Sequence, residues 1–348
     1  MAIVGDALMD MHGIAKIAGV SSATVSRVIN GSKLVRPETT GRVQRVIDEL
    51  KFFPNSSATT LKHGKSSTYG LIIPDITNPF FPEFIRCFEK ILVENNRDML
   101  MATIDSHATR MQQSVRRMLV RKVDGVVLLA AEIETEPIEA LIHNKVPLVT
   151  LERRLVAPWV SDVMVNYAAG IGLAVAHLKE LGHTKIGYIG ASAGPTISNH
   201  RVNGFKKALK KYGLQLYPEF IRVGDYRTTG GQTGMTELLA LKERPTAILA
   251  ANDLTAIGAL RTIYQRGYTV PGDFSVIGFD DIDLAGMLYP PLTTLCLPRQ
   301  ELAETVYKAL EFGREHKSAV GQQYTMKTSL VVRESSGVAK AAKRPRSR

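Results

Sequence analysis

The chain has 348 residues, of which 45% are hydrophobic and 22% are charged. This length exceeds the range in which a single hydrophobic core keeps growing, so we expect two or three packed units. The sequence holds no apolar run of about 18 residues that would cross a membrane. Its start carries Asp6 and Asp10 and lacks a basic or long apolar stretch, so we expect no secretory signal and a cytoplasmic protein.

Positive charge is concentrated at the two ends of the chain. The formal net charge is +11; residues 1–65 carry nine basic and five acidic residues, and the last twelve residues contribute +5. The middle of the chain is therefore nearly neutral. We expect the two ends, and not the body between them, to face a polyanion.

Residues 14–50 contain three short helical patterns, in which apolar residues recur at three- and four-residue spacing. Two short helices cross near a right angle when the contact residue is small, the turn allows positive φ and an aliphatic side chain locks the pair. Ala15, Gly19 and Val25 meet these three needs. The segment 15–31 therefore predicts a helix-turn-helix, which places its second helix in the major groove of DNA.

The second helix of this motif has a polar outer face. Ser21 is its expected N-cap, and Val25 with its apolar neighbours faces inward. The residues left to contact DNA, beside the cap, are Ser22, Ala23, Ser26, Arg27 and Asn30. Arg27 is the strongest candidate for reading a guanine edge, because its guanidinium donates two hydrogen bonds in a fixed geometry. The alternative interpretation is a helical hairpin with an exposed arginine.

A polar stretch between Pro54 and Gly64 follows this head. We take 1–54 as the DNA-binding head and 55–65 as a linker with room for one or two weak helical turns. On the residues alone, a flexible linker whose Leu61 packs against the core is the favoured interpretation.

From Tyr69 onward, short aliphatic runs alternate with amphipathic helical patterns. Strands are expected at 70–75, 98–104, 124–130, 146–152, 185–190, near 221, at 246–253 and at 274–281. Helices are expected at 81–96, 111–121, 170–181, 202–212, 233–241 and 255–266. Continuous apolar strands separated by helices indicate parallel sheets covered on both faces, so we expect an α/β body of two doubly wound subdomains.

The end of the chain is expected to complete both subdomains. A last helix at 302–312 and strands within 325–332 would cross back between them. We therefore expect an effector-binding and dimerisation domain at 66–336, with a first subdomain at about 69–165 and 299–322 and a second at about 166–295 and 323–336. Residues 337–348 hold too few apolar side chains to pack and are predicted to form a basic, disordered tail.

Several motifs in one order make the chain resemble the lactose-repressor (LacI/GalR) family. They are IAKIAGVSSATVSRVINGS, VRPETTGRVQRVIDELKFFPN and ATTLK in the head, and LGHTKIGYIG, AILAAND, VPGDFSVIGFDD and PPLTTL in the body. The resemblance extends from about Asp10 to Glu334. It implies a sequence-specific transcription regulator, a repressor in the first instance, whose body has the periplasmic-binding-protein-like fold.

The resemblance also implies a hinge helix from Asn55 to Lys62. A helix this short is unstable alone in water, so it would order only when two copies meet on DNA. Leu61, with Ala58 three residues before it, would then insert into the minor groove and bend the duplex. This predicts a homodimer on near-palindromic operator DNA, with a ligand that controls hinge ordering; whether the ligand induces or corepresses stays open.

Ligands of doubly wound units bind at the carboxyl ends of the strands, and two joined units would hold a ligand between them. Most of the candidate effector residues directly follow the strands, and the resemblance adds one arginine and one aromatic residue. The full set is Asn78, Phe80, Phe81, Glu152, Arg153, Arg201, Tyr226, Asn252 and Asp280. Aromatic faces stack on sugar rings while Asn, Asp and Arg bind adjacent hydroxyls, so we expect a sugar or sugar acid. Structural alternatives remain: the phenylalanines as core, Asn78 as a turn and Asp280 as a cap.

The sequence departs from the family pattern at three places. Glu152 stands where aspartate is usual, which changes the reach of the carboxylate, and 195–198 is a segment where the polar contacts vary. Gly13 stands where aspartate is usual, which leaves Asp10 as the cap of the first helix. Arg153 and Arg154 together favour an acidic sugar, while Arg154 as a solvated surface charge is the alternative.

Two other functions were weighed against regulation. Acid–base chemistry at Asp253, Asp280 or Asp281 would make the chain a carbohydrate-active enzyme, but a nucleophile elbow, a phosphate loop and paired metal-binding histidines are absent from the sequence. A free sugar-binding protein is disfavoured by the attached head. Cys87 and Cys296 are too few for a disulfide framework or a cysteine zinc site, so we expect no metal, no cofactor and no enzymatic activity.

Overall fold

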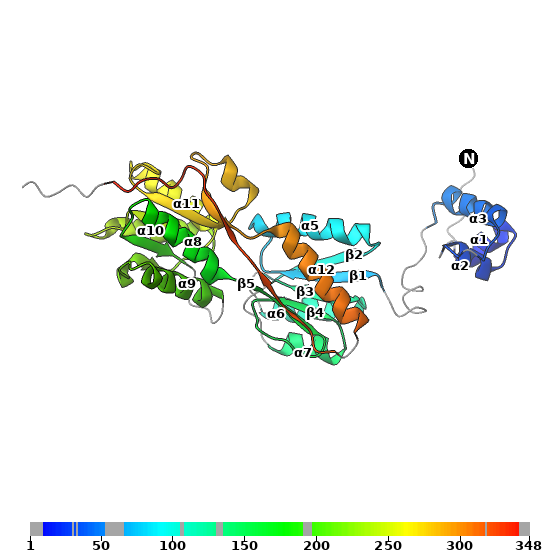
Figure 1. The fold of residues 1–348 in the computed structure, drawn as a ribbon. Coiled ribbons are helices and arrows are strands. Elements are labelled where there is room, and N and C mark those ends of the chain that lie inside the picture. Colours follow the sequence, from blue (N-terminus) through cyan, green and yellow to red (C-terminus); the bar gives the residue numbers. More distant parts are fainter. Residues whose placement is uncertain are drawn as a thin grey trace, which may run out of the picture. The chain divides into compact units, whose positions relative to one another are not determined.

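The structure is a computed structural model that describes residues 10–29, 31–32, 34–52, 66–104, 108–129, 135–190, 197–316 and 319–340. The chain divides into two compact units, the head Met1–Ser66 and the body Ser67–Arg348. Figure 1 shows the helical head and, in the body, two α/β subdomains.

The head consists of helices α1 (Met11–Ala18), α2 (Ser22–Ile29) and α3 (Pro37–Glu49). Asp10 caps α1, because its Oδ1 accepts hydrogen bonds from the backbone N–H groups of His12 at 3.0 Å and Gly13 at 2.9 Å, which confirms the expected cap. The helices share one small core, made by Ile14, Ala15, Ala18, Val25, Val28, Val43, Val46 and Ile47.

The first subdomain is built on a six-stranded sheet in the order β11-β5-β4-β3-β1-β2, and all neighbouring strands are parallel. The strands are β1 (Thr68–Ile73), β2 (Asp98–Thr103), β3 (Gly125–Leu128), β4 (Leu148–Leu151), β5 (Val160–Val165) and β11 (Gln323–Met326). Leu71 and Ile73 pack on one face and Ile72 on the other, as the two-residue period of a strand requires.

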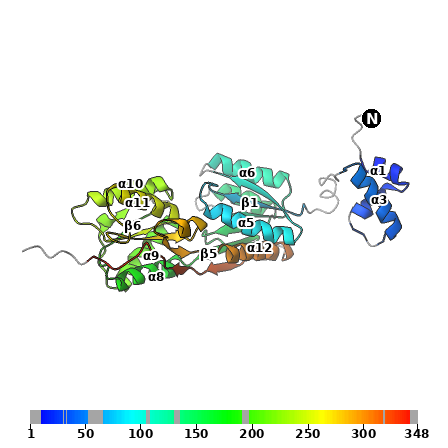
Figure 2. The ribbon, with the colours of Figure 1, turned by 90° about the horizontal axis from the view of Figure 1, so that it is seen from above.

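Helices cover both faces of this sheet (Figures 1 and 2). Helix α5 (Phe80–Glu94) packs against α12 (Arg299–Glu315) on one face, and α6 (Ala108–Val120) packs against α7 (Thr135–His143) on the other. Burial on both faces explains why the strands are continuously apolar.

The second subdomain has a six-stranded sheet in the order β12-β10-β9-β8-β6-β7. Its strands are β6 (Ile186–Ile189), β7 (Ile221–Arg222), β8 (Ala247–Ala250), β9 (Ser275–Asp280), β10 (Thr293–Cys296) and β12 (Ser329–Val331). Strand β12 runs antiparallel to β10, so this sheet is mixed at one edge. The helices are α8 (Tyr167–Glu180), α9 (Ile197–Lys211), α10 (Thr228–Ala240) and α11 (Asp253–Gln265), with 3₁₀ turns η1 (Pro218–Phe220) and η2 (Asp283–Met287).

Within the described residues the chain passes between the two subdomains at β5–α8, at β10–α12 and at β11–β12. The expected boundary at 322/323 is wrong by four residues, because β11 pairs with β5 and so belongs to the first sheet. The sequence around 323–332 alternates in both strands, and alternation alone does not say with which sheet a strand pairs.

Residues 337–340, the predicted start of the disordered tail, are bound to the body instead. The backbone N–H of Gly337 donates to Ser275 Oγ at 3.0 Å, that of Ala339 donates to the Leu181 carbonyl at 2.8 Å, and Lys340 Nζ lies 2.5 Å from Asp273 Oδ1. Backbone hydrogen bonds and one ion pair, which need no apolar side chain, hold this segment on the body. Residues 341–348 lie outside the described residues.

Candidate functional site

Helix α2 presents the expected polar face. Ser21 Oγ accepts a hydrogen bond from the Thr24 backbone N–H at 3.2 Å, and Gly19 turns the chain before it with φ +64°. Ala23 and Arg27 are exposed, while Ser22 and Ser26 are half-buried. The arrangement gives α2 one apolar side against the head's core and one outward side suited to a DNA groove.

His12 is a residue of the head that sequence reasoning missed. Its Nδ1 lies 2.5 Å from Ser22 Oγ, so α1 fixes the side chain of a residue expected to contact DNA. Its position in the first turn of α1 gave no periodic signal. The remaining head and hinge residues of the prediction, Asn30, Asn55, Ala58, Leu61 and Lys62, lie outside the described residues.

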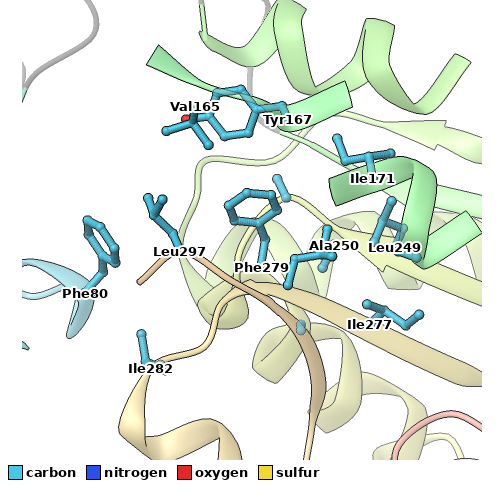
Figure 3. Packing of buried hydrophobic residues seen from close by; sticks show 14 of the residues in the cluster. Phe80, Val165, Tyr167, Ile171, Leu249, Ala250, Ile277, Phe279, Ile282 and Leu297 are labelled. Atoms are coloured by element: carbon cyan, nitrogen blue, oxygen red, sulfur yellow. The ribbon is translucent and has the colours of Figure 1, made fainter. Parts of the chain in front are cut away.

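In the first subdomain, the loop after β1 and the first turn of α5 carry three of the predicted effector residues. Asn78 Oδ1 accepts a hydrogen bond from the Phe80 backbone N–H at 3.1 Å, so Asn78 makes the turn into α5. Phe80 is buried and meets Phe81 edge to face, with ring centroids 5.5 Å apart. Figure 3 shows Phe80 on one side of Leu297, and Tyr167 with Phe279 on the other.

Arg201 on α9 lies among aromatic rings in the second subdomain. The guanidinium carbon is 4.4 Å from the ring centroid of Phe279, 4.7 Å from that of Tyr167 and 5.4 Å from that of Tyr226. One guanidinium nitrogen donates to the Ala251 carbonyl, and another lies 3.5 Å from the Tyr167 hydroxyl. We call Arg201 and these three rings the Arg201 cluster. It combines stacking surfaces with a fixed cation.

Asn252 holds one residue of this cluster, Tyr226, in place. Its Oδ1 accepts from the Thr255 backbone N–H at 2.9 Å and thereby caps α11, and its Nδ2 donates to the Tyr226 carbonyl at 2.9 Å. Tyr226 has φ +62°, a left-handed conformation that a tyrosine rarely adopts. The Asn252 side chain therefore holds the aromatic residue that faces Arg201.

Asp280 ends β9 beside the cluster. Its side chain is buried, and burial raises its pKa to about 7 although Arg201 and Arg299 act in the opposite direction. The neighbouring Asp253 is also buried, which raises its pKa to about 8; its Oδ1 accepts from Thr294 Oγ1 at 2.5 Å and its Oδ2 from the Ile282 backbone N–H at 2.9 Å. Both Asp253 oxygens thus hold the fold together.

Glu152 lies between the subdomains. One carboxylate oxygen accepts a hydrogen bond from the Val165 backbone N–H, and Oε2 lies 3.3 Å from His200 Nδ1 on α9. Burial raises the Glu152 pKa to about 7. The carboxylate therefore links the ends of β4 and β5 to a helix of the other subdomain.

The backbone of the two arginines after Glu152 is held by a residue that sequence reasoning missed. Asp162 Oδ1 accepts from the Arg153 N–H at 3.1 Å, and Asp162 Oδ2 accepts from the Arg154 N–H at 2.9 Å. Thr150 Oγ1 also donates to Asp162 at 2.6 Å. Asp162 is fully buried, and such a carboxylate needs hydrogen-bond partners; in the sequence the signal was only an aspartate among mostly apolar residues.

A pocket of about 350 Å³ lies beside this region, lined in part by Glu152, Tyr167, His200 and Lys207. Of the predicted effector residues, only Glu152 lines it. The structure thus groups Glu152, Arg201, Tyr226, Asn252 and Asp280, and it places the Asn78–Phe81 turn on the first subdomain. The two sides meet where Arg227, next to Tyr226, forms an ion pair of 2.6 Å with Asp75.

Comparison with known proteins decides the family. Residues 10–55 match the bacterial regulatory proteins of the lacI family, and residues 175–336 match the periplasmic binding protein-like domain. The ribose operon repressor of Haemophilus influenzae is 33% identical over 326 residues, which cover 93% of this chain and 98% of that protein. The chain belongs to the LacI family.

Solved LacI-family structures share the architecture. The Lac repressor dimer bound to operator and the anti-inducer ONPF superimposes with a TM-score of 0.84 at 25% identity, covering 94% of this chain and 98% of that one. A LacI family transcriptional regulator from Enterococcus faecium with bound ribose gives a TM-score of 0.71 at 29% identity, covering 78% of this chain and 100% of that one.

Membership confirms the fold class and the assignment as a DNA-binding transcription regulator of this family. A search of the helices in the described part of the chain finds none that is both long and apolar enough to cross a membrane.

Proposed function

We propose that this LacI-family protein is a repressor whose operator affinity is set by a sugar or sugar derivative bound between the two subdomains. The observation that carries the proposal is the Arg201 cluster with the buried Asp280 beside it. Flat aromatic faces stack on a pyranose or furanose ring, while a guanidinium and a carboxylate bind its hydroxyls. The ribose bound to the Enterococcus faecium regulator makes D-ribose the first candidate.

Glu152 and Asp280 add a chemical requirement for such a ligand. Both carboxyls are buried, and burial raises the pKa of each to about 7, so each gains from a hydrogen-bond donor that replaces lost water. A neutral polyol brings such donors without a second negative charge. This favours a neutral sugar at these two carboxyls, with Arg153 and Arg154 as the place where an acidic sugar would be accommodated.

The operator contacts are proposed for the outer face of α2. Arg27 is exposed there, with Ala23 one turn earlier and Ser26 beside it. The hinge residues Asn55 to Lys62 and the minor-groove insertion of Leu61 stay a prediction, together with the domain boundaries at 54 and 65. The Lac repressor structure in complex with its operator supports this arrangement.

We propose a homodimer, as in the Lac repressor dimer. Met287 and Tyr289 are 78% and 93% exposed at and just after η2, and the Tyr264 hydroxyl donates to the Tyr289 backbone carbonyl at 3.4 Å. Large exposed apolar side chains in one region of the fold are candidates for an interface. We expect Tyr289→Asp to yield monomers in size-exclusion chromatography with light scattering, whereas Val120→Asp, at an exposed position on α6, leaves the dimer intact.

We further propose that the chain acts by binding alone and catalyses no reaction. The relatives are repressors, and two of the three aspartates that acid–base chemistry would use are engaged: Asp253 by Thr294 and Ile282, and Asp281 by Arg333. Acting on DNA in a cell without a nucleus, the protein is proposed to work in the cytoplasm.

The test of the effector is a thermal-shift screen of the full chain against D-ribose, other aldoses, sugar acids and sugar phosphates. We expect a saturable rise in the midpoint with one class, abolished by Arg201→Gln and kept by Arg244→Gln, because Arg244 stacks on Tyr268 at 6.0 Å outside the Arg201 cluster. A panel in which no sugar derivative raises the midpoint contradicts the sugar assignment.

A further inference from the structure

The turn that follows β9 is held from outside its own subdomain. Arg299, the first residue of α12, donates from Nη1 to the Asp280 carbonyl at 2.9 Å. Asp280 has φ +116°, a backbone conformation that costs a non-glycine residue on the order of 1–3 kcal/mol and persists only where its surroundings fix it. The Arg299 hydrogen bond is one such restraint.

Arg299 also contacts the first subdomain. Its Nε lies 2.9 Å from Glu83 Oε2 on α5, and both side chains are largely buried, with 16% and 12% of their surfaces exposed. Glu83 Oε1 in turn accepts a hydrogen bond from the Asp283 backbone N–H at 2.9 Å. The carboxylate of Glu83 therefore grips the turn twice, directly at Asp283 and through Arg299 at Asp280.

The Glu83–Arg299 ion pair is largely buried, whereas a second ion pair beside it is exposed. Arg86, one helical turn after Glu83, lies 3.5 Å from Asp283, but 73% and 55% of these side chains are exposed. Exposed ion pairs contribute little because solvent screens them, whereas a buried pair that loses one partner leaves an uncompensated charge. Arg86 therefore provides a control at the same helix and the same partner.

We propose that Arg299 is a positioning residue for the effector site, which with Glu83 connects the Asp280 turn to helix α5 of the first subdomain. The inference rests on the proposed role of Asp280 in effector binding. A ligand that hydrogen-bonds to the Asp280 carboxylate changes the conformation of the 280–283 turn. This turn contacts Glu83 directly at Asp283 and through Arg299 at Asp280. Ligand binding in the second subdomain is thereby transmitted to α5, the helix that also carries Phe80.

We call the chain of contacts from Asp280 through Arg299 and Glu83 to α5 the relay. A relay allows a variant to keep its ligand affinity and lose the transmission to α5, which a purely structural role would not allow. In Glu83→Gln the Arg299–Asp280 hydrogen bond remains, so D-ribose affinity changes by less than about threefold, while the ligand no longer protects α5. In Arg299→Gln the turn itself is loosened, so affinity falls by about 5- to 150-fold, the range that corresponds to the backbone strain. The double variant resembles Arg299→Gln, because both changes break one connection.

The test is hydrogen exchange of the full chain with and without saturating D-ribose, alongside calorimetric titration. We expect ribose to slow exchange in 280–283 and in α5 of the wild type and of Arg86→Gln, and to slow it only in 280–283 of Glu83→Gln. Equal protection of α5 in Glu83→Gln and wild type would overturn the relay.

A second arm needs no ligand and separates this inference from the proposed effector. If the wild type fails to bind ribose, the effector assignment fails, but the relay is still tested by exchange in the free protein. There we expect exchange in 280–283 at least threefold faster in Glu83→Gln and Arg299→Gln than in Arg86→Gln. Identical exchange in 280–283 of all three variants refutes the relay.

Discussion

Replacing Glu152 by glutamine changes how the stability of the body depends on pH. The carboxyl is 1% exposed, and burial raises its pKa from 4.5 to about 7. A carboxyl whose pKa is higher in the folded than in the unfolded state contributes stability that is fully present below the unfolded pKa. That contribution is lost as the pH rises through the folded pKa. With these two pKa values, the loss between pH 5 and pH 8 is about 2–3 kcal/mol.

Glutamine has the same shape and keeps an oxygen that accepts from the Val165 N–H, but it does not ionise. We therefore expect the free energy of unfolding of Glu152→Gln, relative to wild type, to rise by about 2–3 kcal/mol from pH 5 to pH 8. Asp253 and Asp280 titrate with the same sign, but they are present in both proteins and cancel in the difference.

The assay is urea unfolding of the full chain at constant ionic strength, followed by the fluorescence of Trp159, the single tryptophan of the chain, which precedes β5. Glu89→Gln, at an exposed position on α5, is the matched control for the loss of one glutamate. If the Glu152→Gln difference is no steeper than that of the control from pH 5 to pH 8, the argument from burial is refuted.

Four further outcomes are expected. Arg27→Ala should weaken operator binding by about 1–3 kcal/mol in fluorescence anisotropy and leave the thermal midpoint of the body unchanged; an unaltered affinity would remove Arg27 as base reader. Gly258→Ala should destabilise by about 1–3 kcal/mol, because its Cβ would lie 2.0 Å from the Thr228 carbonyl oxygen of α10. Gly172→Ala, with no atom within 4 Å of the added carbon, is its control in the same denaturation series. Burial lowers the His183 pKa below 6.5, so the wild type should lose stability as the pH falls below about 6.5 while His183→Gln loses less; parallel pH curves would speak against this. Truncation after Ser336 should lower the thermal midpoint by removing the Ala339–Leu181 hydrogen bond and the Lys340–Asp273 ion pair, whereas truncation after Lys340 should not, and equal midpoints would contradict the packing of 337–340.

Periodicity predicted the helices and central strands because burial repeats regularly along them. It missed α7 (Thr135–His143), which carries a proline and only a few buried residues, and it missed β5 (Val160–Val165), whose apolar run is broken by Ser161 and Asp162. It also left β10 (Thr293–Cys296) as an unassigned motif, because Thr293 and Thr294 look like loop residues in sequence. All four polar side chains are buried and hydrogen-bonded, a property of the fold and not of the local sequence.

The sequence predicted those residues of the candidate site that lie at the carboxyl ends of strands. The sequence placed Asp280 and Asn252 correctly at the ends of β9 and β8. It had no means to show that Asn252 holds Tyr226, or that Glu152 faces His200, because those contacts join segments 26 and 48 residues apart. The sequence did not reveal Arg299 and Asp162 for the same reason, because their partners lie in other segments of the chain.

The three passages between the subdomains also govern how the chain folds during synthesis. Strand β5 borders β11, which ends at Met326, so the first sheet stays incomplete until nearly the whole chain has been made. At about 5–20 residues per second, the helices of the head, complete by Glu49, precede β11 by on the order of tens of seconds. During that interval β5 presents an unpaired strand edge, which is the element most prone to join another nascent chain.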